Sequence, residues 1–361
     1  MKKIFYASLF LFIFIYLFSS LLNAQESDSS AQTKKLEVSA GIDVYYTFSS
    51  DKNNNPEIYP AVSSYINEFR LNLARVSLKY NYVKTRGLFT IHYGDIPEIN
   101  WKPYTKFDFI QEANIGFSPV KNLWVDAGFF QTHLGIEGWP ADNFLSSNAL
   151  VSVSEPSIQS GVRVMYDFSD KVSAGIHILN GFGIYEDNNK NKTFGVQIIY
   201  NISNSVQFNY NNLIGNEMPA GVAGKVRQFH NFIVTGNPFK KLEYQAELDI
   251  GSQENSKLQD SNSTAYLYGG LLSLRYHFNP QISLTLRGDY YQDLDGILSG
   301  LINDKTGLKG NGVNLGFEYK PVEKSYVRLE YGFLRLDDSQ RVFYNNDNQR
   351  HSLTLSFGLV Y

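Results

Sequence analysis

The stretch that decides the fold is the end of the chain, Gln349–Tyr361, which reads Gln-Arg-His-Ser-Leu-Thr-Leu-Ser-Phe-Gly-Leu-Val-Tyr. Its apolar residues share one parity and its polar or small residues the other: Leu353, Leu355, Phe357, Leu359 and Tyr361 alternate with Ser352, Thr354, Ser356 and Gly358. Successive side chains of a strand point to opposite faces, so this period of two predicts a strand with one apolar and one polar face. Such a strand separates two unlike environments, and we take it as the template for the rest of the chain.

The composition favours one all-β barrel. The chain has 361 residues, with 25 Tyr and 26 Phe but only 19% charged residues. This length would fit two ordinary domains, but it is also typical of a single large barrel. A membrane barrel needs no long apolar run, because its lipid-facing and lumen-facing residues alternate along each strand.

Several classes of site are excluded by what the sequence lacks. It has no cysteine, which excludes disulfides, thiolate metal sites, a catalytic thiol and a lipoprotein anchor. The six histidines include no i,i+4 pair, so no zinc site is predicted. A formal net charge of -3 excludes the basic footprint of a nucleic-acid-binding protein. We therefore expect no enzyme activity, no cofactor, no metal and no nucleic-acid partner.

The first residues predict an export signal. Lys2 and Lys3 precede an apolar run that ends at Leu22-Asn23-Ala24-Gln25. A positive segment, an apolar segment and a small residue before the cut describe a secretory signal peptide over residues 1–24, cleaved after Ala24. An uncleaved anchor is the alternative, because the run is long enough to span a membrane. Residues 25–35 then form a polar lead-in, and residues 36–361 are expected to form the barrel.

Alternating strands recur from Leu36 to the end of the chain. The candidates are residues 36–47, 69–82, 88–94, 110–117, 123–131, 158–166, 172–179, 194–200, 206–213, 229–235, 242–251, 266–278, 282–291, 313–319, 326–336 and 349–361. The parity slips between Leu73 and Ala74, which predicts a β-bulge. An even number of about sixteen strands predicts a transmembrane antiparallel up-and-down β-barrel of the bacterial outer-membrane type.

The connections alternate between short and long. The short ones are rich in turn-forming residues, as in Asn279-Pro280-Gln281, whereas the long ones include residues 95–108, 133–157 and 292–312. In an up-and-down barrel this predicts periplasmic turns at one end and extracellular loops at the other, whereas Greek-key crossings would scramble the order. Aromatic residues gather beside the short turns, which favours an interfacial girdle against lipid and lipopolysaccharide.

The polar parity carries most of the charges of the strands. A charge that faces lipid at mid-membrane depth costs about 2–4 kcal/mol, so these residues are expected to point into the lumen. The candidates for lining a pore are Lys79, Glu112, Asp126, Arg163, Arg275, Arg287, Arg328 and Glu330, and Arg75 shares their parity. Both signs are present, so no ion selectivity is predicted; the alternative is that these charges pair with each other and fill the interior.

Residues 133–157 form the longest connection and the most apolar one. They include Trp139, Phe144, Leu145 and Val151, a content that is unusual for a loop in water. We expect this loop to fold into the barrel and narrow it, with Glu137, Trp139 and Asp142 as candidates for the constriction. The alternative is a loop packed over the rim or against a partner subunit.

Two parts of the chain carry a family resemblance. The first comprises Glu112–Phe117 (Glu-Ala-Asn-Ile-Gly-Phe), Lys121–Phe130 (Lys-Asn-Leu-Trp-Val-Asp-Ala-Gly-Phe-Phe) and Thr132–Glu137, and the second comprises Gly161–Tyr166 with Val172–Ile176 and Leu179-Asn180-Gly181. They resemble the putative β-barrel porin-2 family, the OmpL-like porins of Gram-negative bacteria. The Phe- and Tyr-rich composition is similar to that of Bacteroidota secretory proteins, and phosphate-selective porins have a similar size and layout. The resemblance implies a channel of the outer membrane with no catalytic residues.

From the pattern and the resemblance together we expect a porin that passes small hydrophilic solutes by diffusion, with a homotrimer expected by analogy. Two rivals remain at this point. One is a non-conducting surface barrel for adhesion or as a subunit of a complex, and the other is a secreted soluble β-protein whose apolar parity forms a sandwich core.

Overall fold

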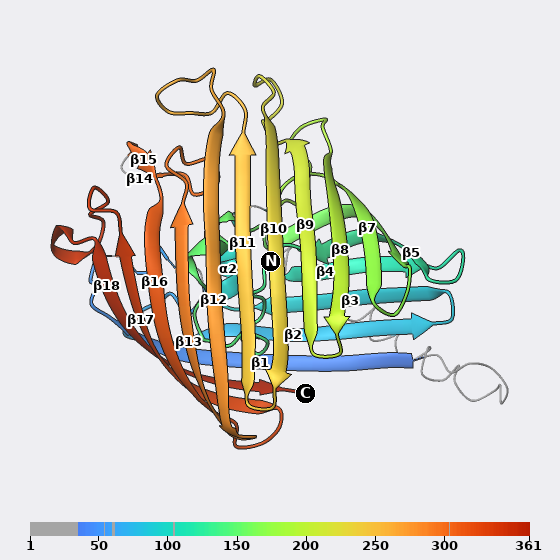
Figure 1. The fold of residues 1–361 in the computed structure, drawn as a ribbon, viewed down its shortest axis with the longest axis horizontal. Helices are drawn as coiled ribbons and strands as arrows, with labels where there is room; N and C mark the ends of the chain where they lie inside the picture. The colour runs from blue at the N-terminus through green and yellow to red at the C-terminus, as the bar shows by residue number, and fades with distance from the viewer. Residues whose placement is uncertain (1–34, 54, 60–61, 104, 303) are drawn as a thin grey trace, which may run out of the picture.

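The fold is a closed barrel of antiparallel strands (Figure 1). The computed structural model describes residues 35–53, 55–59, 62–103, 105–302 and 304–361. The expected signal peptide, residues 1–24, and all of the lead-in before Lys35 lie outside the described residues. Within those described ranges, no helix is both long and apolar enough to cross a membrane.

Sixteen strands of the described chain form the barrel, and each pairs with its neighbours along the chain. In chain order they are β1 (Lys35–Ser49), β2 (Phe69–Tyr82), β3 (Thr85–Tyr93), β4 (Ile110–Phe117), β5 (Leu123–Gln131), β6 (Ile158–Asp167), β7 (Val172–Leu179), β8 (Thr193–Ser203), β9 (Val206–Asn216), β10 (Val226–Phe239), β11 (Leu242–Gln253), β12 (Ala265–Asn279), β13 (Ile282–Gln292), β16 (Lys309–Tyr319), β17 (Ser325–Leu336) and β18 (Gln349–Val360). β18 returns to pair with β1, from Gly41 opposite Val360 to Ser49 opposite Ser352, which closes the sheet. Closure leaves no free edge, as a barrel requires.

The final strand has the two faces that its alternation predicts. Leu353 is 45% exposed on the outside of the barrel, whereas its neighbour Thr354 is 4% exposed inside. The outward residues of the other strands are likewise apolar and exposed, and the inward ones are mostly polar and buried. This arrangement is wrong for a secreted sandwich, which would bury its apolar parity, and it contradicts that rival.

The structure differs from the prediction in the position of the bulge in β2. The bulge in β2 lies at Asn72, because Asp43 of β1 pairs with Leu73 while Val44 pairs with Leu71. The predicted position between Leu73 and Ala74 is therefore wrong by about one residue, because both Asn72 and Leu73 are buried and hide the slip from a simple alternation.

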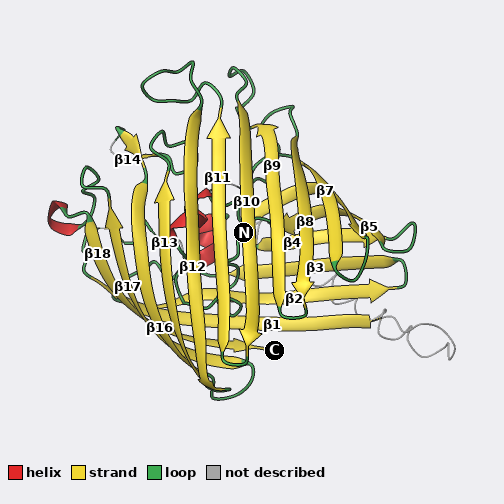
Figure 2. Ribbon diagram, in the orientation of Figure 1, coloured by secondary structure: helices red, strands yellow, loops and turns green. Residues whose placement is uncertain are grey.

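The loops contain short elements that alternation does not predict. They are α2 (Asp95–Asn100), the 3-10 helices η1 (Leu150–Ser154) and η2 (Tyr344–Asn346), and a small hairpin of β14 (Leu301–Ile302) and β15 (Thr306–Gly307). Figure 2 shows these helical turns in red against an otherwise all-strand fold. Each is too short for a periodic signal to appear in the sequence.

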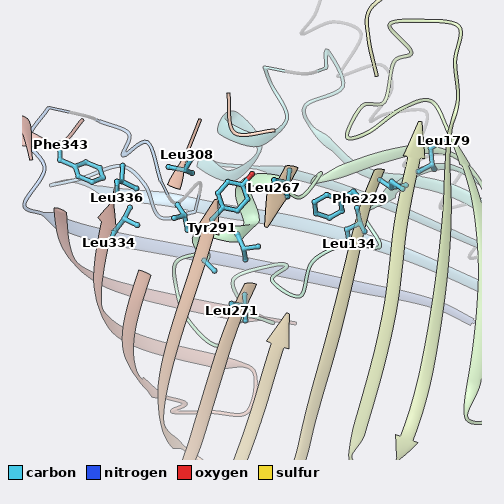
Figure 3. Close-up of a cluster of buried hydrophobic side chains, with 14 residues drawn as sticks. Leu134, Leu179, Phe229, Leu267, Leu271, Tyr291, Leu308, Leu334, Leu336 and Phe343 are labelled. Carbon is cyan, nitrogen blue, oxygen red and sulfur yellow. The ribbon is translucent and has the colours of Figure 1, made fainter. Parts of the chain in front are cut away.

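The apolar core lies inside the barrel, at the end with the long loops. A cluster of buried side chains joins residues of the strand ends, such as Phe229 and Tyr291, to Leu134 of loop 133–157 (Figure 3). Val151 of the same loop also belongs to this cluster. Burial of apolar area is the main term that stabilises folded chains, so this cluster holds the loop within the barrel.

Candidate pore and inserted loop

Residues 133–157, the inserted loop, leave β5 and cross the lumen before the chain enters β6. Near the start of the loop, Ile136 donates its backbone N–H to Glu247 of β11 at 3.1 Å. Further along, the Ser146 hydroxyl lies 2.7 Å from the Ser356 hydroxyl of β18. The loop thus contacts strands on the far side of the barrel from β5 and β6.

Arg287 of β13 is the central anchor of the inserted loop. Its Nη1 donates to Glu137 Oε1 at 2.6 Å and to the Ser147 carbonyl at 2.7 Å. The Arg287 side chain is only 1% exposed, and Asp289 lies beside it with 3.7 Å between Nε and Oδ2. A buried charge needs both a counter-charge and hydrogen bonds, and the loop provides them here.

Two inward residues of β17, Arg328 and Glu330, hold the next part of the inserted loop. Arg328 of β17 donates to Glu318 at 2.5 Å and also to the Pro140 carbonyl of the loop. Glu330 of the same strand accepts the backbone N–H of Ser146 at 2.6 Å and that of Ser147 at 3.1 Å. Inward charges of β17 are therefore used to satisfy the backbone of the loop.

Arg275 of β12 completes this docking surface. Its Nη2 donates to the Asn143 carbonyl at 3.2 Å, and its guanidinium lies 4.0 Å from the ring centroid of Phe144. A glycine also makes room for the loop, because a side-chain carbon at Gly316 of β16 would collide with Leu145.

An acidic cluster marks the end of the inserted loop. Oxygens of Glu155, Glu247 and Asp249 lie within 4.8 Å of one another, and the Asn231 amide donates to both strand carboxylates. Burial raises the pKa of the Glu155 carboxyl well above its usual range, and the charges of Glu247, Asp249 and Glu137 raise that pKa further. Carboxylate oxygens are the ligands that hard cations prefer, and shared protons would neutralise the same charges.

The wall formed by β1 to β5 leaves space beside the inserted loop. A cavity of about 640 Å³ lies there at the short-turn end. It is lined by residues of β1 to β5, by Trp139 and Asp142 of the loop, and by Lys324 and Tyr361. A second cavity of about 360 Å³ at the same end is lined by residues of the turns between β8 and β11 and by Phe144. A cavity nearer the long loops, beside Tyr59 and Ser147, measures only about 40 Å³.

An aromatic cluster lies next to the larger cavity. The ring centroids of Trp101 and Trp139 are 6.0 Å apart in a stacked arrangement, and His92 of β3 is 4.7 Å from Trp101 at its edge. Trp139 is 7% exposed, and its indole N–H donates to Gln131 of β5 at 3.2 Å. α2 brings Trp101 to this place, because Asp95 at its start accepts the Tyr45 hydroxyl of β1 at 2.8 Å.

Family membership decides what kind of barrel this is. The sequence profile of the family described as putative beta-barrel porin-2, OmpL-like, matches residues 35–361. The chain belongs to this family. It is an outer-membrane porin, and the closed barrel with an apolar outer face agrees with that assignment.

Solved structures of other porins have a similar fold. The trimer form of OmpT from Vibrio cholerae gives a TM-score of 0.61 at 10% identity, covering 91% of this chain and 100% of that chain. The anion-selective porin from Comamonas acidovorans gives 0.61 at 8% identity, covering 91% and 100%. DcaP of Acinetobacter baumannii gives 0.61 at 12% identity, covering 92% and 99%. At these identities the likeness shows the fold, and comparison with curated protein sequences finds no match.

The predicted site residues of the porin fall into three groups. Arg275, Arg287, Arg328 and Glu330 are buried against the inserted loop, together with Glu137 of the loop itself. Lys79, Glu112, Trp139 and Asp142 surround the larger cavity. Asp126 is fully buried and pairs with Arg163 across β5 and β6.

Sequence reasoning missed several residues of the porin interior. Arg86 donates to Asp126 at 2.6 Å, although its place beside a short turn concealed its inward direction. Ser147 and Asn143 were missed because loop residues have no parity to reveal their orientation. Inward glycines such as Gly316 and Gly269 were an available signal, since a strand glycine often marks a close approach of another segment.

Proposed function

We propose that this porin passes small hydrophilic solutes by passive diffusion along the β1–β5 wall, and that the inserted loop narrows the lumen. No reaction is part of this function. The observation that carries it is the larger cavity, which lies between polar strand residues and the loop rather than in the apolar core.

The contacts of the inserted loop support the proposal that it narrows the lumen. Its hydrogen bonds and ion pairs reach β11, β13, β17 and β18, so its backbone occupies the part of the lumen next to those strands. Solutes are left with the side of the lumen where Arg75, Lys79 and Glu112 project into open space.

The test is single-channel conductance of the refolded protein in a planar bilayer, compared with a variant that lacks residues 135–155. We expect ohmic steps from the full chain and larger steps from the deletion, because removing the loop widens the lumen.

A matched control shortens a loop that stays outside the barrel. Residues 257–262 lie in the exposed connection between β11 and β12, where the Ser256 N–H bonds the Ser263 carbonyl and would keep the ends together. Their deletion should leave the conductance unchanged. If the folded protein showed no conductance in any of the three forms, the proposed channel function would be refuted.

The same docking contacts favour a second candidate, a non-conducting surface barrel that serves adhesion or a larger complex. In that case the loop would close the lumen fully, and only the deletion variant would conduct.

Three properties of the mature protein belong to the same proposal. Export by a signal peptide cleaved after Ala24 is tested by the mass of the outer-membrane form. A homotrimer, supported by the trimer form of OmpT, is tested by the mass of the native complex. Contact with lipid and lipopolysaccharide is supported by the exposed aromatic residues beside the short turns, such as Phe117 and Tyr361, and is tested by co-purification of lipopolysaccharide.

A further inference from the structure

Two charged side chains that line the larger cavity, Arg75 and Asp142, form no ion pair within 4.0 Å among the described residues. The Arg75 guanidinium lies 5.4 Å from the ring centroid of Trp139. Among the described residues, no carboxylate or hydrogen-bond acceptor contacts that guanidinium. The arginines of the opposite wall, Arg275, Arg287 and Arg328, are all hydrogen-bonded to the inserted loop.

A free carboxylate lies on the same cavity. Asp142 is exposed to it, and the Asp142 backbone N–H bonds the Trp139 carbonyl at 2.9 Å. In the described part of the chain, no cation or hydrogen-bond donor contacts the Asp142 carboxylate. Arg75 and Asp142 also share a smaller adjoining cavity of about 50 Å³, so both face one space around Trp139.

The charged side chains of the cavity lining are three basic and three acidic: Arg75, Lys79 and Lys324 against Glu37, Glu112 and Asp142. Lys79 lies 4.0 Å from Glu37, and Glu112 accepts the Gln131 backbone N–H at 3.1 Å. Among these side chains neither sign is in excess, so they give the cavity no net preference for an anion or for a cation. An ion of either sign would satisfy one free group and be repelled by the other.

We propose that this cavity is a binding station for small zwitterionic solutes, such as free amino acids and short peptides. Arg75 receives the carboxylate of the solute, Asp142 receives its ammonium group, and the Trp139 ring supports the body of the molecule. An arginine fork matches a carboxylate with two charge-assisted hydrogen bonds, and about 640 Å³ is enough for a small solute. The inference rests on the proposed function, because it names the solute class of the same route.

The experiment measures binding by isothermal titration calorimetry on the refolded full chain in detergent. The probes are alanyl-alanine, its N-acetyl derivative, its C-terminal amide, and the form with both ends capped. These probes share one dipeptide body and carry different charges: zwitterion, anion, cation and neutral. We expect the zwitterion to bind about tenfold more tightly than either singly charged form.

Two variants assign the groups. R75Q should remove the advantage of the zwitterion over the amide, because the carboxylate loses its partner. D142N should remove its advantage over the N-acetyl form. R75K keeps the charge but not the fork, and should fall between the full chain and R75Q. R335Q is the matched control, since Arg335 pairs with Asp338 on the exposed surface.

The outcomes separate this inference from the channel itself. Zwitterion binding without conductance would overturn the channel and keep the station. Conductance without a preference for the zwitterion, equal binding in R75Q and D142N, or no binding of any probe would overturn the station. Equal binding of the N-acetyl form would mean a simple anion site and would also overturn it.

Discussion

Two walls of the same barrel carry inward charges of the same kinds but use them differently. On β12 to β17, Arg275, Arg287 and Arg328 are buried and hydrogen-bonded to the inserted loop. On the β1–β5 side, Arg75 and Lys79 project into a cavity of about 640 Å³. The difference teaches that an inward charge in a barrel strand is not by itself a pore charge.

What separates the two walls is the path of residues 133–157. The loop contributes Glu137 and several carbonyl groups to the first wall, which satisfies its arginines. On the second wall it contributes Trp139 and Asp142, of which the first stacks and the second stays open to the cavity. A charge that water still reaches keeps its capacity to bind a solute.

The largest expected effect comes from Arg287→Ala, which would make the docked wall resemble the open one. The substitution leaves Glu137 and Asp289 buried without their partner, and breaking a buried pair in this way costs about 3–5 kcal/mol. We expect the loop to leave its docked position, so that conductance rises and heat-dependent migration on SDS gels shifts to lower temperature.

Arg335→Ala is the control for that experiment. Arg335 and Asp338 form an exposed pair, which contributes at most about 1 kcal/mol. If the two substitutions had equal effects on conductance, the docking role of Arg287 would be refuted.

A smaller effect is expected from steric displacement of the loop. Gly316→Val would place side-chain atoms where Leu145 lies, and overpacking of a filled interior costs about 1–3 kcal/mol. Gly288→Val is the matched control, because no atom lies within 4 Å of the position that its first side-chain carbon would take. We expect larger single-channel steps from Gly316→Val and unchanged steps from Gly288→Val. A larger step from Gly288→Val alone would contradict the docked position of Leu145.

The smallest expected effect is a dependence of loop docking on pH. The docked state raises the pKa of Glu155 above its ordinary value of 4.5, so docking favours the protonated carboxyl. The contribution of Glu155 to the stability of the docked loop is therefore fully present below pH 4.5. It is lost as the pH rises through the raised pKa of Glu155. Conductance measured at about pH 5 and about pH 8 should therefore be higher at the alkaline end.

Glu155→Gln should flatten this profile, because the amide stays neutral at every pH. Glu323→Gln, in the exposed turn between β16 and β17, should leave the profile as it is. A profile that survives Glu155→Gln would assign the pH dependence to another group, with Glu247 and Asp249 the next to test.

Much of the fold could be read from alternation. Residues 349–361 predicted a strand with an apolar outside and a polar inside, and β18 has both faces. The same parity placed Asp126 and Arg163 on one face, and the register sets them directly opposite each other on β5 and β6. The predicted position of the bulge in β2 was about one residue away from Asn72, where the structure has it. Two consecutive buried residues, Asn72 and Leu73, obscure the alternation there.

The candidate site was less accessible to such reasoning. Glu137 and Asp142 looked alike as acids of one apolar loop, yet the first is buried on Arg287 and the second lines the cavity. Arg75 was recognised only as one inward charge among many. Nothing in its own strand distinguishes it from Arg328, because the difference depends on which loop residue comes to lie beside it.

The sequence by itself determined the strand pattern, the all-β class, the approximate strand number and the direction of most strand side chains. These properties depend on a period of two, which neighbouring residues set locally. Only the tertiary structure decided where the inserted loop lies, which arginines it satisfies and which charges it leaves free. Those contacts join residues more than a hundred positions apart, as Glu137 and Arg287 are, and they exist only after the barrel has closed around the loop.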